Sequence, residues 1–170
     1  MERMRRYRWI LLAAGILLAL FLTLQSYEPQ QGSGGMTGQQ APDFSVTMLD
    51  GSTVSLPDLR GKPVLLEFWA PWCVGCRHNI PPLKQLHERF GSRIALIAVA
   101  SETGDKTVAR FVDKNDIAYP VALSNRRMLN AFQINGIPIT VLIDAGGVIR
   151  YYRAGEFTFS HMEQQISRLL

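Results

Sequence analysis

The two cysteines of this chain stand close together, at Cys73 and Cys76. They follow a run of apolar residues and precede a stretch with helical periodicity, so they lie at a predicted junction between a strand and a helix. Across the first turn of a helix, this spacing lets two sulfur atoms approach bonding distance. Cys73 then lies at the helix N-terminus, where unpaired backbone N–H groups and the helix dipole favour a thiolate. We therefore predict that Cys73 is a nucleophile and that Cys76 resolves its mixed disulfide.

Other uses of a cysteine pair fit this sequence less well. A structural zinc site normally takes four ligands, and the chain offers no second cysteine pair and only His78 nearby. A c-type haem site needs histidine directly after the second cysteine, where Arg77 stands. A purely structural disulfide would close a very short loop and remove little loop entropy. A redox role without metal or other cofactor is favoured, and metal binding through the same thiols stays an alternative.

Glu67 stands inside an apolar run at 63–70 (PVLLEFWA), which is typical of a strand covered on both faces. Burying a carboxylate is costly unless it is paired or stays protonated, and burial raises its pKa. Glu67 lies in the middle of this run, six residues before Cys73, and we expect it to be buried there. The alternative is a carboxylate at a strand end that reaches solvent or pairs with Lys62.

The elements that position these residues alternate between strand and helix. Strands are expected at 44–48, 53–55, 63–70, 94–100, 119–123, 139–143 and 148–153, and helices at 74–90, 106–114, 127–132 and 159–170. Asp50-Gly51 and Ala145-Gly146-Gly147 signal two hairpin turns. Pro81 and Pro82 are expected to kink the helix after the cysteines. This order predicts an α/β fold, a mixed central sheet flanked by helices with an N-terminal β-hairpin.

The N-terminal part of the chain differs from this domain in composition. Residues 1–8 hold four arginines against one glutamate, and the 19 residues at 9–27 (WILLAAGILLALFLTLQSY) hold no charge. As a helix, the second segment would extend about 28 Å, close to the hydrocarbon thickness of a bilayer. The arginines favour a cytoplasmic N-terminus, with the C-terminal body on the other side. We expect an uncleaved transmembrane anchor, and a cleaved signal peptide or a buried helix are the alternatives.

Residues 28–40 (EPQQGSGGMTGQQ) are rich in Gly and Gln and poor in apolar residues. This composition predicts a flexible linker, so the folded domain is expected at 41–170. Apolar residues form 47% of the chain, which is enough for a core and excludes a disordered protein. Beyond the first nine residues, 14 basic side chains nearly balance 13 acidic ones, without a basic stripe. A nucleic-acid partner is therefore not expected.

The run Glu67–Cys76 (EFWAPWCVGC), followed by Pro81, resembles the active-site strand and helix of the thioredoxin superfamily. The runs 41–44 (APDF) and 59–70 (LRGKPVLLEFWA) resemble the membrane-tethered TlpA/ResA-like thiol–disulfide oxidoreductases. Gly136-Ile137-Pro138 resembles the cis-proline loop of the superfamily. The resemblance covers about 41–170 and implies a thioredoxin-like fold.

The resemblance also implies roles for residues around the cysteines. Glu67 would occupy the position of the buried acid of the thioredoxin superfamily, and we expect it to shuttle a proton for Cys76, directly or through water. Pro138 would be cis and would face the disulfide, and the backbone of Ile137 would pair with an extended substrate segment. An ordinary trans turn is the alternative for this loop. We expect Trp72, Val74 and Gly75 to contact the substrate beside the nucleophile.

These features predict a thiol–disulfide oxidoreductase in the inner (cell) membrane of a bacterium, with its catalytic domain facing the periplasm. It is expected to reduce protein disulfides, among them those of apocytochrome c during cytochrome c maturation, and to be recharged by a membrane thiol reductase. A dithiol oxidase of the same fold, and a copper carrier or redox-sensing module, are the alternatives. Gly75 replaces a usual proline, Asn79 an acidic residue and Ile139 a threonine. The change at Gly75 leaves the reduction potential open.

Overall fold

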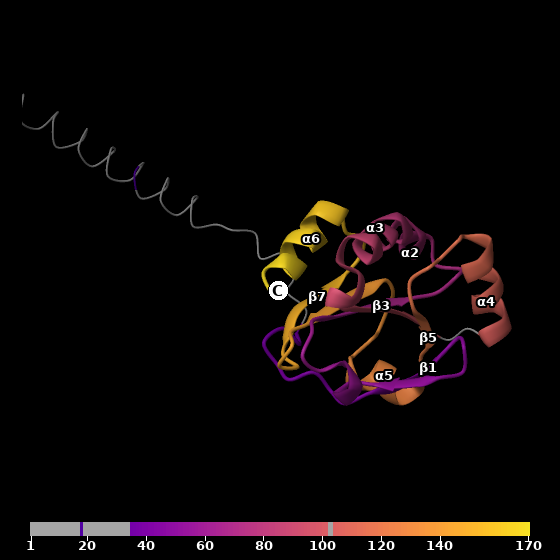
Figure 1. Ribbon diagram of the computed structural model, residues 1–170, viewed down its shortest axis with the longest axis horizontal. Helices are drawn as coiled ribbons and strands as arrows, with labels where there is room; N and C mark the ends of the chain where they lie inside the picture. The colour runs from indigo at the N-terminus through magenta and orange to yellow at the C-terminus, as the bar shows by residue number, and fades with distance from the viewer. Residues whose placement is uncertain (1–17, 19–34, 102–103) are drawn as a thin grey trace, which may run out of the picture. The chain divides into compact units, whose positions relative to one another are not determined.

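The chain folds around a mixed β-sheet with helices on both of its faces (Figure 1). The computed structural model describes residue 18 and residues 35–101 and 104–170. The strands are β1 (Ser45–Met48), β2 (Thr53–Ser55), β3 (Val64–Trp69), β4 (Ala95–Ala100), β5 (Val121–Leu123), β6 (Ile139–Ile143) and β7 (Ile149–Ala154). The helices are α2 (Val74–His78), α3 (Ile80–Phe90), α4 (Asp105–Lys114), α5 (Arg126–Ala131) and α6 (Phe159–Ser167), with the short 3-10 helices η1 (Pro57–Leu59) and η2 (Gly91–Arg93).

Within the described residues, the strands lie in the order β2-β1-β5-β4-β3-β6-β7. The neighbours β3, β4 and β5 run parallel, while β6 runs antiparallel to β3 and β7 antiparallel to β6. β1 and β2 form an antiparallel hairpin at the other edge, and β1 pairs antiparallel with β5. In the turn between β6 and β7, Gly147 has a φ of 87°, a conformation that glycine adopts readily. The predicted mixed sheet with an N-terminal β-hairpin is confirmed.

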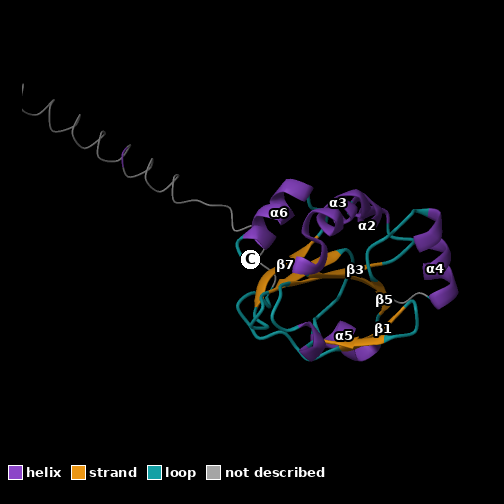
Figure 2. Cartoon of the chain, viewed as in Figure 1, coloured by secondary structure: helices purple, strands orange, loops and turns teal. Residues whose placement is uncertain are grey.

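The central strands divide the core into two layers. Every residue of β3 and β4 is buried, as the apolar runs predicted. Because side chains alternate along a strand, Leu65, Glu67 and Trp69 share one face of β3, and that face packs against α3, α4 and α6. The opposite face packs against α5 and the N-terminal hairpin. Figure 2 shows α2, α3 and α6 on one side of the strands and α5 on the other, so Glu67 faces the helical layer that carries the cysteines.

The helix predicted over 74–90 is divided in two at Asn79. The backbone of Asn79 keeps helical angles, with φ −81° and ψ −12°. Pro81 and Pro82 follow it and have no backbone N–H, so the last carbonyls of α2 lose their helical partners. The regular pattern resumes where the N–H of Leu83 donates to the carbonyl of Asn79. The expected proline kink is therefore a break, and it places a polar side chain at the end of α2.

The folded domain begins before the predicted boundary at residue 41. Met36 is buried in the layer that contains α5. The N–H of Gly38 donates to the carbonyl of Ile149, which lies at the start of β7. The prediction of a flexible linker through 35–40 is therefore wrong, because one methionine and a few backbone bonds fasten this glycine-rich segment to the domain.

The predicted anchor at 9–27 lies, apart from Leu18, outside the residues that the structure describes. The same holds for the basic tip at 1–8 and for residues 28–34 of the predicted linker. No helix in the described part of the chain is long and apolar enough to cross a membrane.

Candidate active site

Cys73 and Cys76 form a disulfide at the start of α2. Cys73 is the N-cap residue, with an extended backbone, and its Sγ accepts a hydrogen bond from the backbone N–H of Cys76 at 3.2 Å. This hydrogen bond satisfies one of the unpaired N–H groups of the first helical turn. It also favours negative charge on the Cys73 sulfur when the disulfide is open. Cys73 is 7% exposed and Cys76 2%, so Cys73 is the cysteine nearer to solvent.

Arg77 fastens the turn that leads into the cysteines. Its Nε and Nη2 atoms donate to the carbonyl oxygen of Pro71 at 3.1 and 2.8 Å. Its guanidinium carbon lies 5.7 Å from the ring centre of Phe111 on α4, and the same ring packs on Trp69 at the end of β3. The charge-assisted pair of hydrogen bonds thereby joins the strand end, the turn and the helix into one unit. In the sequence, Arg77 only excludes a haem site, and no local pattern there marks this contact.

The segment around Pro138 lies against the cysteines. The Ile137–Pro138 peptide bond is cis, the geometry that the resemblance implied. The carbonyl oxygen of Ile137 is 3.8 Å from Cys73 Sγ. In the disulfide this is a contact only, because the sulfur carries no proton, whereas a reduced thiol at the same place has a proton to donate. A Cβ atom added to Gly75 would lie 3.6 Å from Pro138 Cδ, so the first turn of α2 faces the cis-proline ring with room for one methyl group between them.

Glu67 is buried behind the cysteine helix, with 1% of its surface exposed. Its Oε1 accepts a hydrogen bond from Asn79 Nδ2 and its Oε2 accepts one from Thr140 Oγ1, both at 2.7 Å. Burial raises the pKa of the carboxyl group to about 8, although both hydrogen bonds act to lower it. The alternative of a strand-end carboxylate that reaches solvent or pairs with Lys62 is therefore wrong.

Asn79 connects the buried carboxyl group to two other parts of the chain. Its side-chain Oδ1 accepts from the N–H of Phe157 at 3.1 Å, and its Nδ2 lies 3.4 Å from the carbonyl oxygen of Gly155. Its backbone N–H donates to the carbonyl of Cys76. In the sequence, Asn79 stands out only as a departure from the family pattern, and Thr140 does not stand out at all. Both act through partners distant in sequence, so no local motif marks them.

Trp72 and Val74, which flank Cys73, are among the few large apolar side chains exposed on the described domain, at 63% and 67%. Two cavities of about 400 and 490 Å³ share residues 135–137 beside them. The smaller is lined by Trp72, Ser101, Leu129, Ile134, Asn135, Gly136 and Ile137. The larger is lined by Gly35, Gln133, Asn135, Gly136, Ile137, Pro138, Ile139, Tyr152, Ala154 and Gly155. Residues 135–137 thus form a wall that the two cavities share, and Ile137 of this wall lies beside Cys73.

His78 is the one further candidate metal ligand that the sequence offers near the cysteines. Its side chain pairs with a carboxylate instead. Its Nδ1 lies 2.7 Å from Glu156 Oε1, and both side chains are exposed. The described residues contain no group of three or more His, Cys, Asp or Glu side chains placed to hold a metal ion. The pair instead ties the end of α2 to the loop after β7 at the rim of the site.

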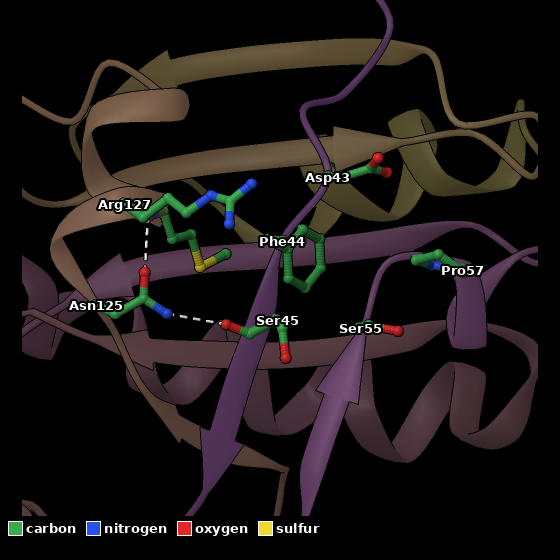
Figure 3. Close-up of a pocket in the computed structure, with 8 residues that line it drawn as sticks. Asp43, Phe44, Ser45, Ser55, Pro57, Asn125 and Arg127 are labelled. Carbon is green, nitrogen blue, oxygen red and sulfur yellow. Dashed lines mark hydrogen bonds between the residues drawn. The ribbon is translucent and has the colours of Figure 1, made fainter.

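A cavity of about 500 Å³ lies elsewhere, between the N-terminal hairpin and α5 (Figure 3). It is lined by Asp43, Phe44, Ser45, Ser55, Pro57, Asn125, Arg127 and Met128. Asn125 caps α5 by accepting from the N–H of Met128, and it donates to the carbonyl of Ser45. Its amide therefore serves the fold, and the lining residues are separate from those around the disulfide.

The cysteine pair, the cis-proline segment and the mixed sheet are features that can be compared with known proteins. Residues 37–152, more than half of the chain, match the model of the AhpC/TSA family. The chain belongs to the AhpC/TSA family. This family member is 34% identical to the thioredoxin-like protein YneN of Bacillus subtilis (strain 168), over 94% of this chain and 96% of that protein. It is 30% identical to the thiol-disulfide oxidoreductase ResA of Bacillus thuringiensis (strain Al Hakam), over 78% of each chain.

Solved structures agree with this membership. The crystal structure of a thiol:disulfide interchange protein of the thioredoxin family from Chlorobium tepidum TLS superposes on the AhpC/TSA-family chain with a TM-score of 0.71. The two are 26% identical, and the match covers 81% of this chain and 99% of that one. The fold is therefore thioredoxin-like, and the chain is a thiol–disulfide oxidoreductase of the ResA-like kind, as the resemblance implied.

Proposed function

We propose that this chain is a membrane-tethered, extracytoplasmic reductase of protein disulfides that works without a cofactor. The observation that carries the proposal is the Cys73–Cys76 pair, which lies at a helix N-cap, against the cis-proline segment and in front of a buried acid. Two sulfur atoms hold the two electrons that the reaction exchanges, so the residues present are sufficient for the chemistry.

In the first step, the thiolate of Cys73 attacks one sulfur of a substrate disulfide. A new S–S bond forms between Cys73 and the substrate, and the second substrate sulfur leaves as a thiolate, which takes a proton from water. The N–H of Cys76, 3.2 Å from Cys73 Sγ, supports the attacking thiolate. The greater exposure of Cys73 supports its assignment as the attacking sulfur.

In the second step, the thiol of Cys76 loses its proton and its sulfur attacks Cys73. The Cys73–Cys76 disulfide forms, and the remaining substrate sulfur leaves as a thiolate. Glu67 is the proposed acceptor of the Cys76 proton, directly or through water. Its pKa of about 8 lies near the ordinary thiol value of about 8.5, so the proton moves between groups of similar affinity.

The substrate is proposed to lie as an extended segment along the cis-proline loop. The backbone of Ile137 would pair with it, and Trp72, Val74 and Gly75 would contact it beside the nucleophile. The two cavities that share residues 135–137 have room for side chains of such a segment. The exposed apolar surface of Trp72 and Val74 supports a protein substrate rather than a small disulfide.

The cellular setting follows from the N-terminal sequence. The uncharged run at 9–27 after four arginines supports an anchor in the bacterial cell membrane with a cytoplasmic N-terminus. The domain then faces a compartment in which disulfides persist. A thiol reductase in the same membrane would recharge it, and apocytochrome c is a proposed substrate during cytochrome c maturation.

A trapping experiment in bacteria tests this proposal. The full chain with Cys76→Ala should accumulate as a disulfide-linked adduct on Cys73, and mass spectrometry identifies the adduct after purification under non-reducing conditions. A doubly substituted control, Cys73→Ala with Cys76→Ala, should yield no adduct. Recovery of apocytochrome c would support the maturation role. If the Cys76→Ala chain carries no protein adduct and the reduced wild-type domain instead binds stoichiometric copper or zinc, the metal-carrier alternative replaces the proposal.

The reduction potential separates a reductase from a dithiol oxidase of the same fold. Equilibration with glutathione buffers should give a value close to that of reducing thioredoxins, about −270 mV. A value near that of strong oxidants, about −120 mV, would favour the oxidase.

A further inference from the structure

The side-chain amide of Asn79 has one orientation that its surroundings permit. Its Oδ1 faces the backbone N–H of Phe157 at 3.1 Å, and its Nδ2 faces the carbonyl oxygen of Gly155 at 3.4 Å. A backbone N–H can only donate and a carbonyl can only accept. Rotating the amide by half a turn would place donor against donor and acceptor against acceptor. Two backbone groups therefore fix which end of Asn79 is the nitrogen.

This orientation restricts the proton of Glu67. The fixed nitrogen of Asn79 also lies 2.7 Å from Glu67 Oε1, so Oε1 must accept a hydrogen bond whether Glu67 is charged or neutral. Glu67 Oε2 lies 2.7 Å from Thr140 Oγ1, and a hydroxyl group can donate or accept. A proton on Oε1 would face the N–H of Asn79, whereas a proton on Oε2 keeps every hydrogen bond. Only a proton on Oε2 leaves the hydrogen bonds of Glu67 with Asn79 and Thr140 in place.

We propose that Asn79 is a positioning residue that confines the proton of Glu67 to Oε2, on the side of Thr140. The inference rests on the proposed function, in which Glu67 exchanges a proton with Cys76. One proton passes from the thiol of Cys76 to Oε2, leaving a thiolate and a neutral carboxylic acid, and no electrons move. The hydroxyl of Thr140 donates to the ionised carboxylate and rotates about its C–O bond to accept from the acid.

The other titratable groups around Glu67 do not compete for this proton. Tyr119 and Tyr151 both sense the charge of Glu67, and burial raises the pKa of each phenol, so both stay neutral where Glu67 titrates. Along β3 the neighbours on the same face, Leu65 and Trp69, are not titratable. In the disulfide form the two cysteines do not titrate either. The titration of Glu67 in the oxidised protein is therefore not coupled to that of a thiol.

Infrared difference spectroscopy of the oxidised full chain, recorded on the two sides of the Glu67 titration, tests the inference. The C=O stretch of the neutral acid is identified by its loss in Glu67→Gln. With the proton on Oε2, the C=O oxygen is Oε1. Asn79→Leu should then raise the C=O frequency, because Oε1 loses its donor. Thr140→Val should raise the frequency of the acid O–H stretch, which Glu67→Gln also lacks, because the proton on Oε2 loses its acceptor. An unmoved C=O band in Asn79→Leu, or an unmoved O–H band in Thr140→Val, overturns the inference.

Thr140→Val alone keeps the test decisive if Asn79→Leu does not fold, because valine has the shape of threonine and touches none of the Asn79 hydrogen bonds. The O–H stretch of the acid should rise in frequency, because its acceptor is lost. The midpoint of the Glu67 titration should rise too, because valine removes one hydrogen bond from each form and the bond to the ionised carboxylate is the stronger. Thr140→Ser should return both to the wild-type values. An unmoved O–H band or an unchanged midpoint contradicts the inference. The readout needs no substrate, so it remains valid even if the proposed reductase activity is absent.

Discussion

At the scale of single residues, the site depends on a carboxyl group that the fold removes from water. Glu67 lies between Asn79 and Thr140, one from the end of α2 and one from β6. Neither partner carries a charge, so desolvation prevails and the pKa rises to about 8. A salt bridge to a lysine would have lowered the pKa and fixed Glu67 as a carboxylate. The neutral partners instead leave a group that can both release and take up a proton near the thiol pKa.

This titration predicts a pH-dependent stability. The folded chain keeps the Glu67 proton up to about pH 8, while the unfolded chain releases it near 4.5. Because the folded state binds more protons between these values, the free energy of unfolding should fall as the pH rises through this window, by about 5 kcal/mol. Glu67→Gln has no proton to lose and should lack this fall. Urea unfolding of both oxidised proteins at several pH values measures it, and equal pH slopes would contradict the prediction.

A substitution of Trp72 should affect the reduction of protein disulfides and of small disulfides differently. Because its side chain is exposed, Trp72→Ala should change the free energy of unfolding by less than about 0.5 kcal/mol. It should lower kcat/KM for a protein disulfide about tenfold and leave a small aromatic disulfide unaffected. Trp69→Ala is the matched control, since this buried tryptophan should cost roughly 3–5 kcal/mol of stability. Equal losses with both substrates in Trp72→Ala would show that Trp72 does not contact the protein substrate.

At the scale of elements, each part of the site is the end of a strand or helix. β3 brings Glu67 and the cysteine turn, the break between α2 and α3 brings Asn79, and β6 begins directly after Pro138 and carries Thr140. The register of β3 against β6 sets Glu67 opposite Thr140. A shift of one residue would turn Thr140 to the other face of the sheet. The site therefore depends on strand register as much as on the cysteine motif.

The strands, the cysteine pair and the buried acid could be predicted because their signals are local. Apolar runs mark β3 and β4, and spacing marks Cys73 and Cys76. Asn79 could not be predicted as a partner of Glu67, because its orientation depends on Phe157, 78 residues away. Because glycines and glutamines surround Met36, the sequence indicates a linker there. Its burial becomes evident only once the segment is packed against the folded domain.

Met36 predicts where the stable domain begins. Met36→Ala should lower the free energy of unfolding by about 2–5 kcal/mol, because it leaves a cavity in the layer beside α5. Leu170→Ala serves as the control, since that side chain is half exposed and should cost little. Urea unfolding compares the two variants with the wild-type chain. A Met36→Ala protein as stable as the control would restore the predicted start of the domain at residue 41.

At the scale of the whole molecule, the parts of the chain differ in their content of charged and apolar residues. Four of the 18 basic residues lie within the first eight positions, and the rest nearly balance the acidic residues. Under the proposed anchor, this clustered charge sets the orientation in the membrane and does not indicate an anionic partner. Two cysteines are too few for a disulfide scaffold, and both belong to the redox site.

The proposed anchor predicts how the protein partitions in cells. The full chain should sediment with membranes, remain there after a carbonate wash and keep the mass of the uncleaved sequence. A chain that lacks residues 1–32 should move to the supernatant and retain disulfide exchange, because the cysteine site lies in the later part of the chain. If cells that express the full chain release it into the supernatant with a shortened N-terminus, the cleaved signal peptide is favoured.

The most direct test of the account asks which cysteine attacks. Reduced Cys76→Ala and reduced Cys73→Ala are each mixed with a peptide that contains one disulfide, quenched with acid at short times and analysed by mass spectrometry. The account predicts a rapid mixed disulfide on Cys73 in Cys76→Ala and at least a hundredfold slower adduct formation in Cys73→Ala, whose remaining thiol is buried. If the Cys73→Ala protein forms its adduct as fast or faster, the assignment of Cys73 as the nucleophile is wrong.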